Sequence, residues 1–363
     1  MDGAVMAEQS PLTPVVHIVR RFSQRGGMER YVWRLVHGLV ARGFRIIVIC
    51  EDHDTLLHPG IQVIQVEAAS SKKRWQQLQH FRHCVDQTLR SHHSFAQAIV
   101  HSHERSVSHQ VTTFHGPLIL SSWSDRLAVY WSRRLKAWAD MERNEVLGEH
   151  VHAVLPVSQL SKNQLTAQYP GLSTKRSFIA WPGVDPIDAA EPCASKPGFE
   201  EPQQFVFVGK EWRRKGLKLA YRIVARYRQV YQETASLHIY GPDPSELPRC
   251  MTSETWVHCH GWQPNVPFDQ YHALIHPAKQ EPFGMIVAEA RRVGLPVLCS
   301  DRVGAVGLEF HGVTVCALSD TSTHWAGQLQ TLIASENVYY SEVKWTWEDL
   351  IALHQEAVYP RCA

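Results

Sequence analysis

Short apolar runs alternate along this chain with longer segments of helical periodicity. The first run, VVHIV at 15–19, precedes a segment in which Val32, Leu35, Val36, Leu39 and Val40 recur at helical spacing. Apolar runs of four to eight residues predict buried strands, and the periodic segments between them predict helices. Further strands are expected at 45–50, 96–103, 110–116, 151–158, 205–209, 236–241, 256–261, 273–278 and 295–300, and long helical segments at 72–92 and 122–148. Such alternation is typical of parallel βα units, so the pattern predicts an α/β protein.

A compositional break divides the pattern in two. Residues 181–204 are rich in proline, glycine and acidic residues, which is typical of a linker. We therefore predict an N-terminal α/β domain at 1–184, a linker at 185–204 and a C-terminal α/β domain at 205–344. Sheets of this kind bind ligands at the carboxyl ends of their strands, so two such domains would face a central cleft.

Composition narrows the class of protein. With 363 residues, of which 44% are hydrophobic, the chain can bury two cores. Lysine and arginine number 37 against 35 acidic residues, and a net charge of +2 argues against a nucleic-acid partner. The N-terminus lacks the pattern of a signal peptide, and no apolar run is long enough to span a membrane. We expect a cytoplasmic protein, with peripheral attachment to the inner face of the cytoplasmic membrane as an alternative.

The stretch EPFGMIVAEA places two carboxylates, Glu281 and Glu289, around a turn and the start of a helix. A turn that opens a helix exposes backbone N–H groups and the positive end of the helix dipole, which suits a diphosphate or a sugar beside one. The residues expected to present this backbone are Phe283, Gly284, Met285 and Ile286. The alternative is a purely structural helix cap with a solvated Glu289.

EPFGMIVAEA followed by GLPVLCSDRVGA resembles the E-x7-E signature of retaining, nucleotide-sugar-dependent glycosyltransferases of the GT-B fold, family 4 (glycosyl transferases group 1). Other segments are similar to that family in the same order: RRFSQRGGMERYVWRL, VHAVLPVSQLSK, IAWPGVDP, FVFVGKEWRRKGLKLAYRI and WTWEDLIALHQEAV. The resemblance implies two Rossmann-like, doubly wound domains. It also implies an acceptor-side N-terminal domain, a nucleotide-sugar-binding C-terminal domain, and a closing helix at 345–363 that crosses back to the N-terminal domain.

The resemblance also implies roles for single residues. Glu281 would accept hydrogen bonds from sugar hydroxyls, and Glu289 would hold the ribose. Lys210 and Lys215 would neutralise the diphosphate, although Lys210 stands where the family usually has arginine. His115, at the end of a predicted strand, would contact the donor sugar. We thus expect the catalytic residues to be Glu281, His115, Lys215 and Lys210.

The remaining predicted binding residues lie at loops and strand ends. Gly26 and Gly27 open a helix and would allow close approach of phosphate or acceptor. Gly241 and Trp262 lie in segments that border the nucleobase in the family, and His103 ends a strand near the predicted site. For each the alternative is an ordinary structural role. The pairs His101-x-His103 and His258-x-His260 lack the partners that a metal site needs, so we expect no metal and no cofactor beyond the nucleotide-sugar co-substrate.

A basic, aromatic segment at 126–138 combines Arg126, Arg133, Arg134 and Lys136 with Tyr130, Trp131 and Trp138. It is suited to anionic lipid head groups of the inner leaflet or to a phosphorylated acceptor. The alternative is a helix with a solvated cationic face.

These observations predict a hexosyltransferase that moves a hexose from a UDP- or GDP-sugar to a hydroxyl of a glycan or glycolipid, with retention of configuration. We expect its setting to be lipopolysaccharide core or another cell-envelope glycan. The alternatives are a non-hydrolysing sugar-nucleotide epimerase of the same fold and a non-catalytic sugar-nucleotide-binding subunit. The sequence leaves the donor sugar, the base and the acceptor open.

Overall fold

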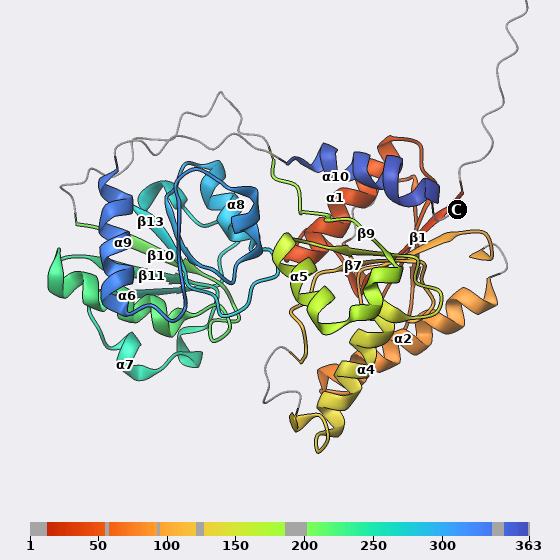
Figure 1. Cartoon of the computed structure of the whole chain (residues 1–363), viewed down its shortest axis with the longest axis horizontal. Coiled ribbons are helices and arrows are strands. Elements are labelled where there is room, and N and C mark those ends of the chain that lie inside the picture. The colour runs from red at the N-terminus through yellow and green to blue at the C-terminus, as the bar shows by residue number, and fades with distance from the viewer. Residues whose placement is uncertain are drawn as a thin grey trace, which may run out of the picture. The chain divides into compact units, whose positions relative to one another are not determined.

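The computed structural model describes residues 13–54, 58–92, 95–120, 127–185, 202–335 and 345–361. The chain forms two compact units, each built around a parallel β-sheet (Figure 1). One unit comprises residues 1–157, 162–183 and 347–363, and the other comprises 158–161 and 184–346. The prediction of an α/β protein with two parallel-sheet domains is confirmed.

The N-terminal unit holds a seven-stranded sheet in the order β5-β3-β1-β6-β7-β8-β9, with every neighbouring pair parallel. Its strands are β1 (Val15–Ile18), β3 (Ile46–Cys50), β5 (Ile61–Gln65), β6 (Ile99–Ser102), β7 (Val111–Phe114), β8 (Ala153–Pro156) and β9 (Arg176–Ser177). Two short strands pair separately, β2 (Arg21–Phe22) and β4 (Asp52–His53). The helices are α1 (Gly27–Ala41), α2 (Arg74–Ser91), α4 (Arg133–Leu147), α5 (Gln159–Gln168), α10 (Trp347–Leu353) and the short turns η2 (Pro170–Thr174), η6 (His354–Val358) and η7 (Tyr359–Arg361).

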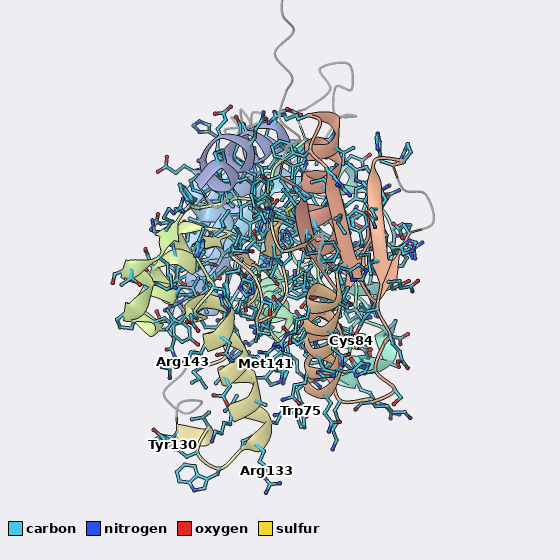
Figure 2. The ribbon with its side chains drawn as sticks, turned by 90° about the vertical axis from the view of Figure 1, so that its right-hand side faces the viewer. Trp75, Cys84, Tyr130, Arg133, Met141 and Arg143 are labelled. Carbon is cyan, nitrogen blue, oxygen red and sulfur yellow. The ribbon has the colours of Figure 1, made fainter. Side chains whose placement is uncertain are left out.

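Strand alternation gives this sheet two different faces. Val16 and Ile18 of β1 and Val100 of β6 pack with α2 and α4 in one apolar cluster. Because successive strand residues point to opposite faces, His17 and His101 point to the other face. Figure 2 shows Trp75 and Met141 where α2 and α4 meet. The apolar cluster thus covers one face, while a histidine-rich strip lies on the other.

The C-terminal unit holds a six-stranded parallel sheet in the order β12-β11-β10-β13-β14-β15. Its strands are β10 (Gln204–Val208), β11 (Ser236–Tyr240), β12 (Val257–Gly261), β13 (Ala273–His276), β14 (Val297–Ser300) and β15 (Val313–Cys316). Its helices are α6 (Leu217–Val230), α7 (Arg249–Thr252), α8 (Met285–Arg292), α9 (Ser322–Ala334) and the 3-10 turns η3 (Pro244–Glu246), η4 (Phe268–Gln270) and η5 (Gly304–Leu308). One apolar cluster joins the sheet to α6 and α9.

Each sheet has a point where the order of its strands reverses direction. In the N-terminal unit this point lies between β1 and β6, and in the C-terminal unit it lies between β10 and β13. Open α/β sheets bind ligands beyond the carboxyl ends of their strands at such a point. The loops after β10 and β13 are therefore where a ligand of the C-terminal unit is expected.

Most predicted strands match observed ones within a few residues, but some elements differ. The edge strands β5, β9 and β15 were not predicted, because they are only partly buried and do not form continuous apolar runs. The start of the helix expected at 122–148 lies outside the described residues; within the described part, a turn at 129–131 precedes α4, and the Ser132 hydroxyl caps α4 by accepting a hydrogen bond from Leu135 N. The predicted linker, 185–204, lies largely outside the described residues.

The C-terminal segment lies in the N-terminal unit, as the resemblance implied. Helix α10 packs against α1, where Ile351 fills the space beside Gly38. Across the described ranges, no helix combines the length and hydropathy that crossing a bilayer would require.

Candidate active site

The loop after β10 brings positive charge to the strand ends of the C-terminal unit. Lys210 is exposed, whereas Arg214 and Lys215 are partly buried. Lys215 Nζ and Arg214 Nη1 each lie 3.2 Å from the same oxygen, Oε2 of Glu281 in the loop after β13. The two loops on either side of the strand-order reversal are thus joined by ion pairs.

Glu281 is an ionised, largely buried carboxylate with only 11% of its side chain exposed. Burial by itself would raise its pKa, but neighbouring His276 and the charges of Lys215 and Arg214 hold the pKa well below the usual carboxyl range. The contact to His276 Nε2 is 3.7 Å, longer than a hydrogen bond, so the two cations are its nearest partners. A carboxylate held in this way remains an anion at any working pH.

The turn from Glu281 to Gly284 delivers the chain into α8 with its first N–H groups unpaired by any side-chain cap. The loop after β14 supports this turn, since Glu281 N donates to Arg302 O and Ala305 N donates to Phe283 O. Gly284 has φ +98°, and a Cβ there would lie 2.9 Å from Val303 Cγ1. Only glycine fits this turn without strain.

The predicted residues around the start of α8 differ in accessibility. Phe283 is buried, so its side chain cannot contact a ligand and only its backbone is available. Met285, Ile286 and Glu289 are partly exposed. Met285 and Glu289 are four residues apart and therefore share a helix face. Glu289 thus lies about one turn after the N-terminal end of α8.

Gly241, predicted to border the base, lies next to the loop that carries Lys210. A Cβ at Gly241 would lie 2.8 Å from Lys210 N and 2.8 Å from Gly209 C, so the two strand ends approach as closely as glycine allows. Trp262 follows the end of β12 and is 63% exposed, which leaves its ring free for stacking. Lys210, Gly241 and Trp262 thus follow the carboxyl ends of three adjacent strands.

In the N-terminal unit His115 follows β7 and is partly exposed. Tyr31 of α1 packs edge-on against its ring at 4.7 Å, and α1 begins one turn earlier at Gly27, with Gly26 as its N-cap. Gly26, Gly27 and His115 therefore belong to one neighbourhood. His103, in contrast, is only 2% exposed, and its Nδ1 lies 3.2 Å from His115 Nε2. His103 therefore lies behind His115, and its direct contact with substrate stays a prediction.

Two residues at the C-terminal site escaped the sequence analysis. Arg214 pairs with Glu281, and buried His276 lies against the same carboxylate. Three consecutive basic residues, Arg213-Arg214-Lys215, indicate a positively charged loop. No periodicity in the sequence indicates which of the two arginines pairs with Glu281. The backbone turn at 211–215 decides it, and it places Arg213 over the Trp212 ring instead.

Two groups among the described residues have enough metal-binding side chains to be considered as cation sites. Cys316, Asp320 and His324 form one, but burial raises the pKa of the Cys316 thiol to about 11, and Asp320 Oδ2 already accepts a hydrogen bond from Ala317 N. The other comprises His17, His101 and His103, where both His101 nitrogens are engaged at 2.8 Å by Tyr359 and Thr113. Hydrogen bonds within the protein therefore account for the ligand atoms of His101.

Family comparisons cover most of the chain. Residues 25–187 match the model described as glycosyltransferase family 4, and residues 202–335 match the model described as glycosyl transferases group 1. No curated protein sequence matches the chain.

Solved structures share the fold at low sequence identity. WaaG, a glycosyltransferase involved in lipopolysaccharide biosynthesis, has a TM-score of 0.71 at 17% identity, with 96% of this chain and 97% of WaaG covered. Sucrose-phosphate synthase from Thermosynechococcus elongatus has a TM-score of 0.70 at 18% identity, covering 96% and 98%. Anabaena HepE in complex with UDP and glucose has a TM-score of 0.63 at 15% identity, covering 97% and 100%. The two family models, supported by the shared GT-B fold, identify the chain as a member of glycosyltransferase family 4 and hence as a glycosyltransferase.

Proposed function

We propose that this enzyme transfers a hexose from a nucleotide diphosphate sugar to a hydroxyl of a glycan or glycolipid, with retention of the anomeric configuration. The observation that carries the proposal is the group of Lys215, Arg214 and Glu281 beside the uncapped start of α8. Positive charge and free N–H groups at one strand edge are what a diphosphate leaving group needs.

The charges at this edge suit a leaving group that becomes more negative as the sugar departs. Glu281 shares its negative charge with Arg214 and Lys215, and Glu211 pairs with Arg214 as well, so these four charges balance one another. Exposed Lys210 makes no salt bridge within the described residues and adds a further cation. Fixed charges of this kind stabilise the transition state without reorganisation. We accordingly propose that the reaction needs no metal ion.

The state of Glu281 favours a mechanism without a covalent intermediate. Its carboxylate is shared by two cations and largely buried, which makes it a weak nucleophile and a weak base. We propose a front-face displacement in which the bond between the sugar and the phosphate oxygen breaks as the acceptor oxygen bonds to the anomeric carbon on the same face. The acceptor proton then passes to the departing phosphate oxygen.

Structural neighbours support the choice of donor and setting. HepE is described in complex with UDP-glucose, and WaaB is described as a lipopolysaccharide outer core galactosyltransferase. We propose a UDP-sugar as the first donor to test, with a GDP-sugar as the second. We propose lipopolysaccharide core or another cell-envelope glycan as the acceptor class.

The N-terminal unit carries a surface that suits an anionic glycolipid. Tyr130 and Trp131 are 80% and 81% exposed, and Arg133, Arg134 and Lys136 beside them are also exposed. Figure 2 shows Tyr130 and Arg133 together at the N-terminal end of α4. Trp138 does not belong to this surface, since it packs into the α2–α4 cluster, and Arg126 lies outside the described residues. We propose peripheral contact of this surface with anionic lipid on the cytoplasmic side of the membrane.

The experiment is a transfer assay followed by proton NMR, with UDP- and GDP-hexoses and a panel of glycan acceptors. The proposal predicts release of nucleoside diphosphate that depends on acceptor, and a product with the donor's anomeric configuration. An inverted product would contradict the retaining mechanism. Conversion of the donor to a different sugar without acceptor would indicate an epimerase, and binding without any turnover would indicate a non-catalytic subunit.

A further inference from the structure

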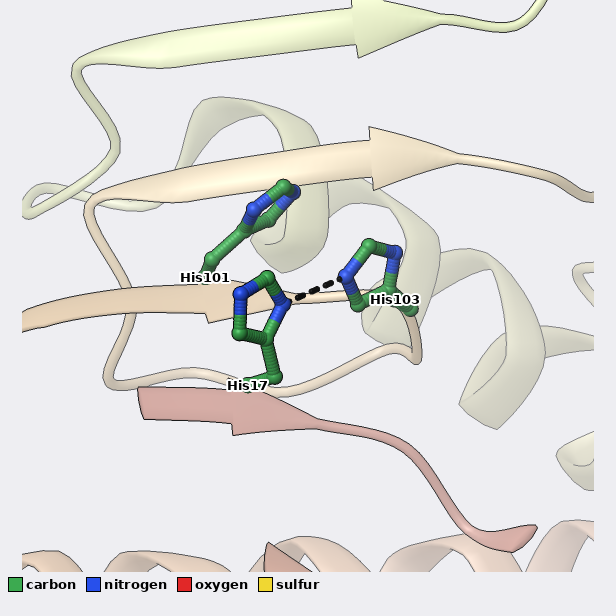
Figure 3. A group of neighbouring side chains, drawn as sticks. All are labelled: His17, His101 and His103. Atoms are coloured by element: carbon green, nitrogen blue, oxygen red, sulfur yellow. Dashed lines mark hydrogen bonds between the residues drawn. The ribbon is translucent and has the colours of Figure 1, made fainter. Parts of the chain in front are cut away.

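A strip of histidines lies where the strand order of the N-terminal sheet reverses. His17 of β1 and His101 of β6 are register partners on adjacent strands, and both point away from the α2–α4 cluster. His103 follows β6, and its ring lies beside that of His17 (Figure 3). His17, His101 and His103 are at most 2% exposed.

The rings form one continuous chain of hydrogen bonds. His115 Nε2 lies 3.2 Å from His103 Nδ1. His103 Nε2 lies 3.1 Å from His17 Nδ1, the contact drawn as a dashed line in Figure 3. His17 Nε2 faces the Tyr359 hydroxyl at 3.4 Å, and that hydroxyl lies 2.8 Å from His101 Nδ1. His101 Nε2 ends the chain at Thr113 Oγ1, 2.8 Å away.

These imidazoles are neutral, because burial lowers the pKa of His17 and of His115 to about 3 and lowers those of His101 and His103 well below the normal value. A neutral imidazole carries one N–H and one acceptor nitrogen. Each bond between two rings therefore needs one hydrogen, and the tautomer of one ring decides that of the next.

Tyr359 decides the direction in which the hydrogens run. Its hydroxyl lies 2.8 Å from His101 Nδ1 and 3.4 Å from His17 Nε2, so its stronger hydrogen bond is the one to His101. When the hydroxyl donates that stronger bond, a lone pair of the same oxygen faces His17 Nε2. Two facing lone pairs repel, so His17 must carry its hydrogen on Nε2.

The order then follows ring by ring to His115. His17 Nδ1 is an acceptor and requires the hydrogen on His103 Nε2. His103 Nδ1 is in turn an acceptor and requires the hydrogen on His115 Nε2. This leaves Nδ1 of His115 as an acceptor, and among the described residues no group donates to it.

We propose that this chain of hydrogen bonds, set by Tyr359, holds His115 as the single neutral tautomer with its hydrogen on Nε2, so that Nδ1 accepts a hydrogen bond from a substrate hydroxyl. Tyr359 and the buried histidines are positioning residues that act through His115. The part that concerns substrate rests on the proposed function: the ligand class is a nucleotide diphosphate sugar with a free hydroxyl at the contact. A deoxy sugar would leave the acceptor nitrogen unpaired and bind more weakly.

The first test needs no ligand. Protein labelled with ¹⁵N in histidine is studied by long-range ¹H–¹⁵N correlation, with His115→Gln and His103→Gln used for assignment. The proposal predicts protonated Nε2 and acceptor-type Nδ1 for His115 in the wild type. Tyr359→Phe keeps the ring but removes the hydroxyl, so His115 should shift to an average of both tautomers.

Tyr271→Phe is the matched control, since Tyr271 is a buried tyrosine of the other unit whose hydroxyl pairs with Tyr240 at 2.7 Å. It should leave the His115 signals unchanged. A wild-type His115 protonated on Nδ1, or a spectrum that Tyr359→Phe does not alter, would overturn the proposal. So would stoichiometric Co²⁺ binding that moves the His17 and His103 signals together, because that outcome indicates a metal site.

The second test separates this proposal from the proposed function. Tyr359→Phe should weaken binding of the intact UDP- or GDP-sugar about tenfold, the size of one hydrogen bond, and leave binding of the free nucleotide unchanged. Equal weakening of both would overturn the positioning role. If no nucleotide sugar binds to the wild type while the tautomers are as predicted, the proposed function fails and the hydrogen-bond order stands.

Discussion

At the scale of single residues, Glu281 controls how positive charge is held at the strand ends of the C-terminal unit. It pairs with Lys215 and Arg214 at equal distances of 3.2 Å. Lys215 was implied by the resemblance of FVFVGKEWRRKGLKLAYRI to the family, but Arg214 was not. Periodicity indicates which segment forms a helix, whereas the side chain that reaches a carboxylate depends on the turn between β10 and α6.

The depressed pKa of Glu281 predicts an acid-dependent loss of stability. Its ordinary value is 4.5, and the folded value is lower despite burial, because His276, Lys215 and Arg214 favour the ionised form. The stabilisation is therefore fully present above about pH 4.5 and is lost as the pH falls toward the folded value. Near pH 4, unfolding of the wild type should take up about one proton more than unfolding of Glu281→Gln.

Urea unfolding between about pH 6 and pH 4 measures this proton uptake. Glu233→Gln, which changes an exposed glutamate of the same unit, serves as control and should behave as the wild type does. Identical uptake in the wild type and Glu281→Gln would contradict the ion-paired state of Glu281.

At the scale of elements, the entry into α8 is the feature most sensitive to backbone geometry. Gly284→Ala should weaken nucleotide binding at least tenfold and lower stability by about 1–3 kcal/mol, because φ is +98° and the added Cβ meets Val303. Gly43→Ala is a matched control, since Gly43 has φ +85° but open space around the added Cβ.

Calorimetric titration and thermal melting of both variants test this prediction. Gly43→Ala should lose stability through its φ alone and bind nucleotide as the wild type does. Unchanged binding in Gly284→Ala would show that the turn does not form part of the nucleotide site.

The buried histidines of the N-terminal sheet predict a second dependence of stability on pH. It arises from imidazoles that are kept neutral, whereas the first arises from a carboxylate that is kept ionised. Burial lowers the pKa of His17 from 6.5 to about 3, so the unfolded chain binds a proton that the folded chain does not. Stability therefore falls as the pH drops below about 6.5, by about 1.4 kcal/mol per pH unit for each such histidine. His17→Gln should reduce proton uptake on unfolding near pH 5 by about one.

Exposed His83 provides the control, because His83→Gln removes a histidine outside the buried strip. The measurement is the slope of unfolding free energy against pH, from about pH 7 to pH 5. A slope that His17→Gln leaves unchanged would mean that His17 is already protonated in the folded protein.

At the scale of the whole molecule, the sequence predicted the architecture better than the site. Ten apolar runs predicted strands that the structure contains, because buried parallel strands need continuous apolar residues. Edge strands such as β5 and β15 did not stand out, since their outer positions are polar or exposed. Hydrogen-bond partners such as Tyr359 could not be predicted, because they join residues 342 positions apart through the fold.

The aromatic and basic surface around Tyr130 predicts selective binding to anionic membranes. Vesicles that contain phosphatidylglycerol should sediment the wild type, vesicles of phosphatidylcholine alone should not, and high salt should release it. The double variant Tyr130→Ser, Trp131→Ser should lose most of this binding. Tyr231→Ser changes an exposed aromatic of the other unit and should have no effect. Equal binding to both kinds of vesicle would contradict an electrostatic contact.

The measurement that tests the central claim most directly is calorimetric binding of UDP-, GDP- and ADP-sugars and the free nucleotides to the wild type, Lys215→Ala and Glu289→Ala. Lys218→Ala, which changes an exposed lysine at the second position of α6, serves as control. We predict that one nucleotide series binds, that Lys215→Ala and Glu289→Ala each weaken it by about tenfold or more, and that Lys218→Ala does not. Failure of every nucleotide to bind at millimolar concentration, or equal affinity in all four proteins, would contradict a donor site at the carboxyl ends of β10 and β13.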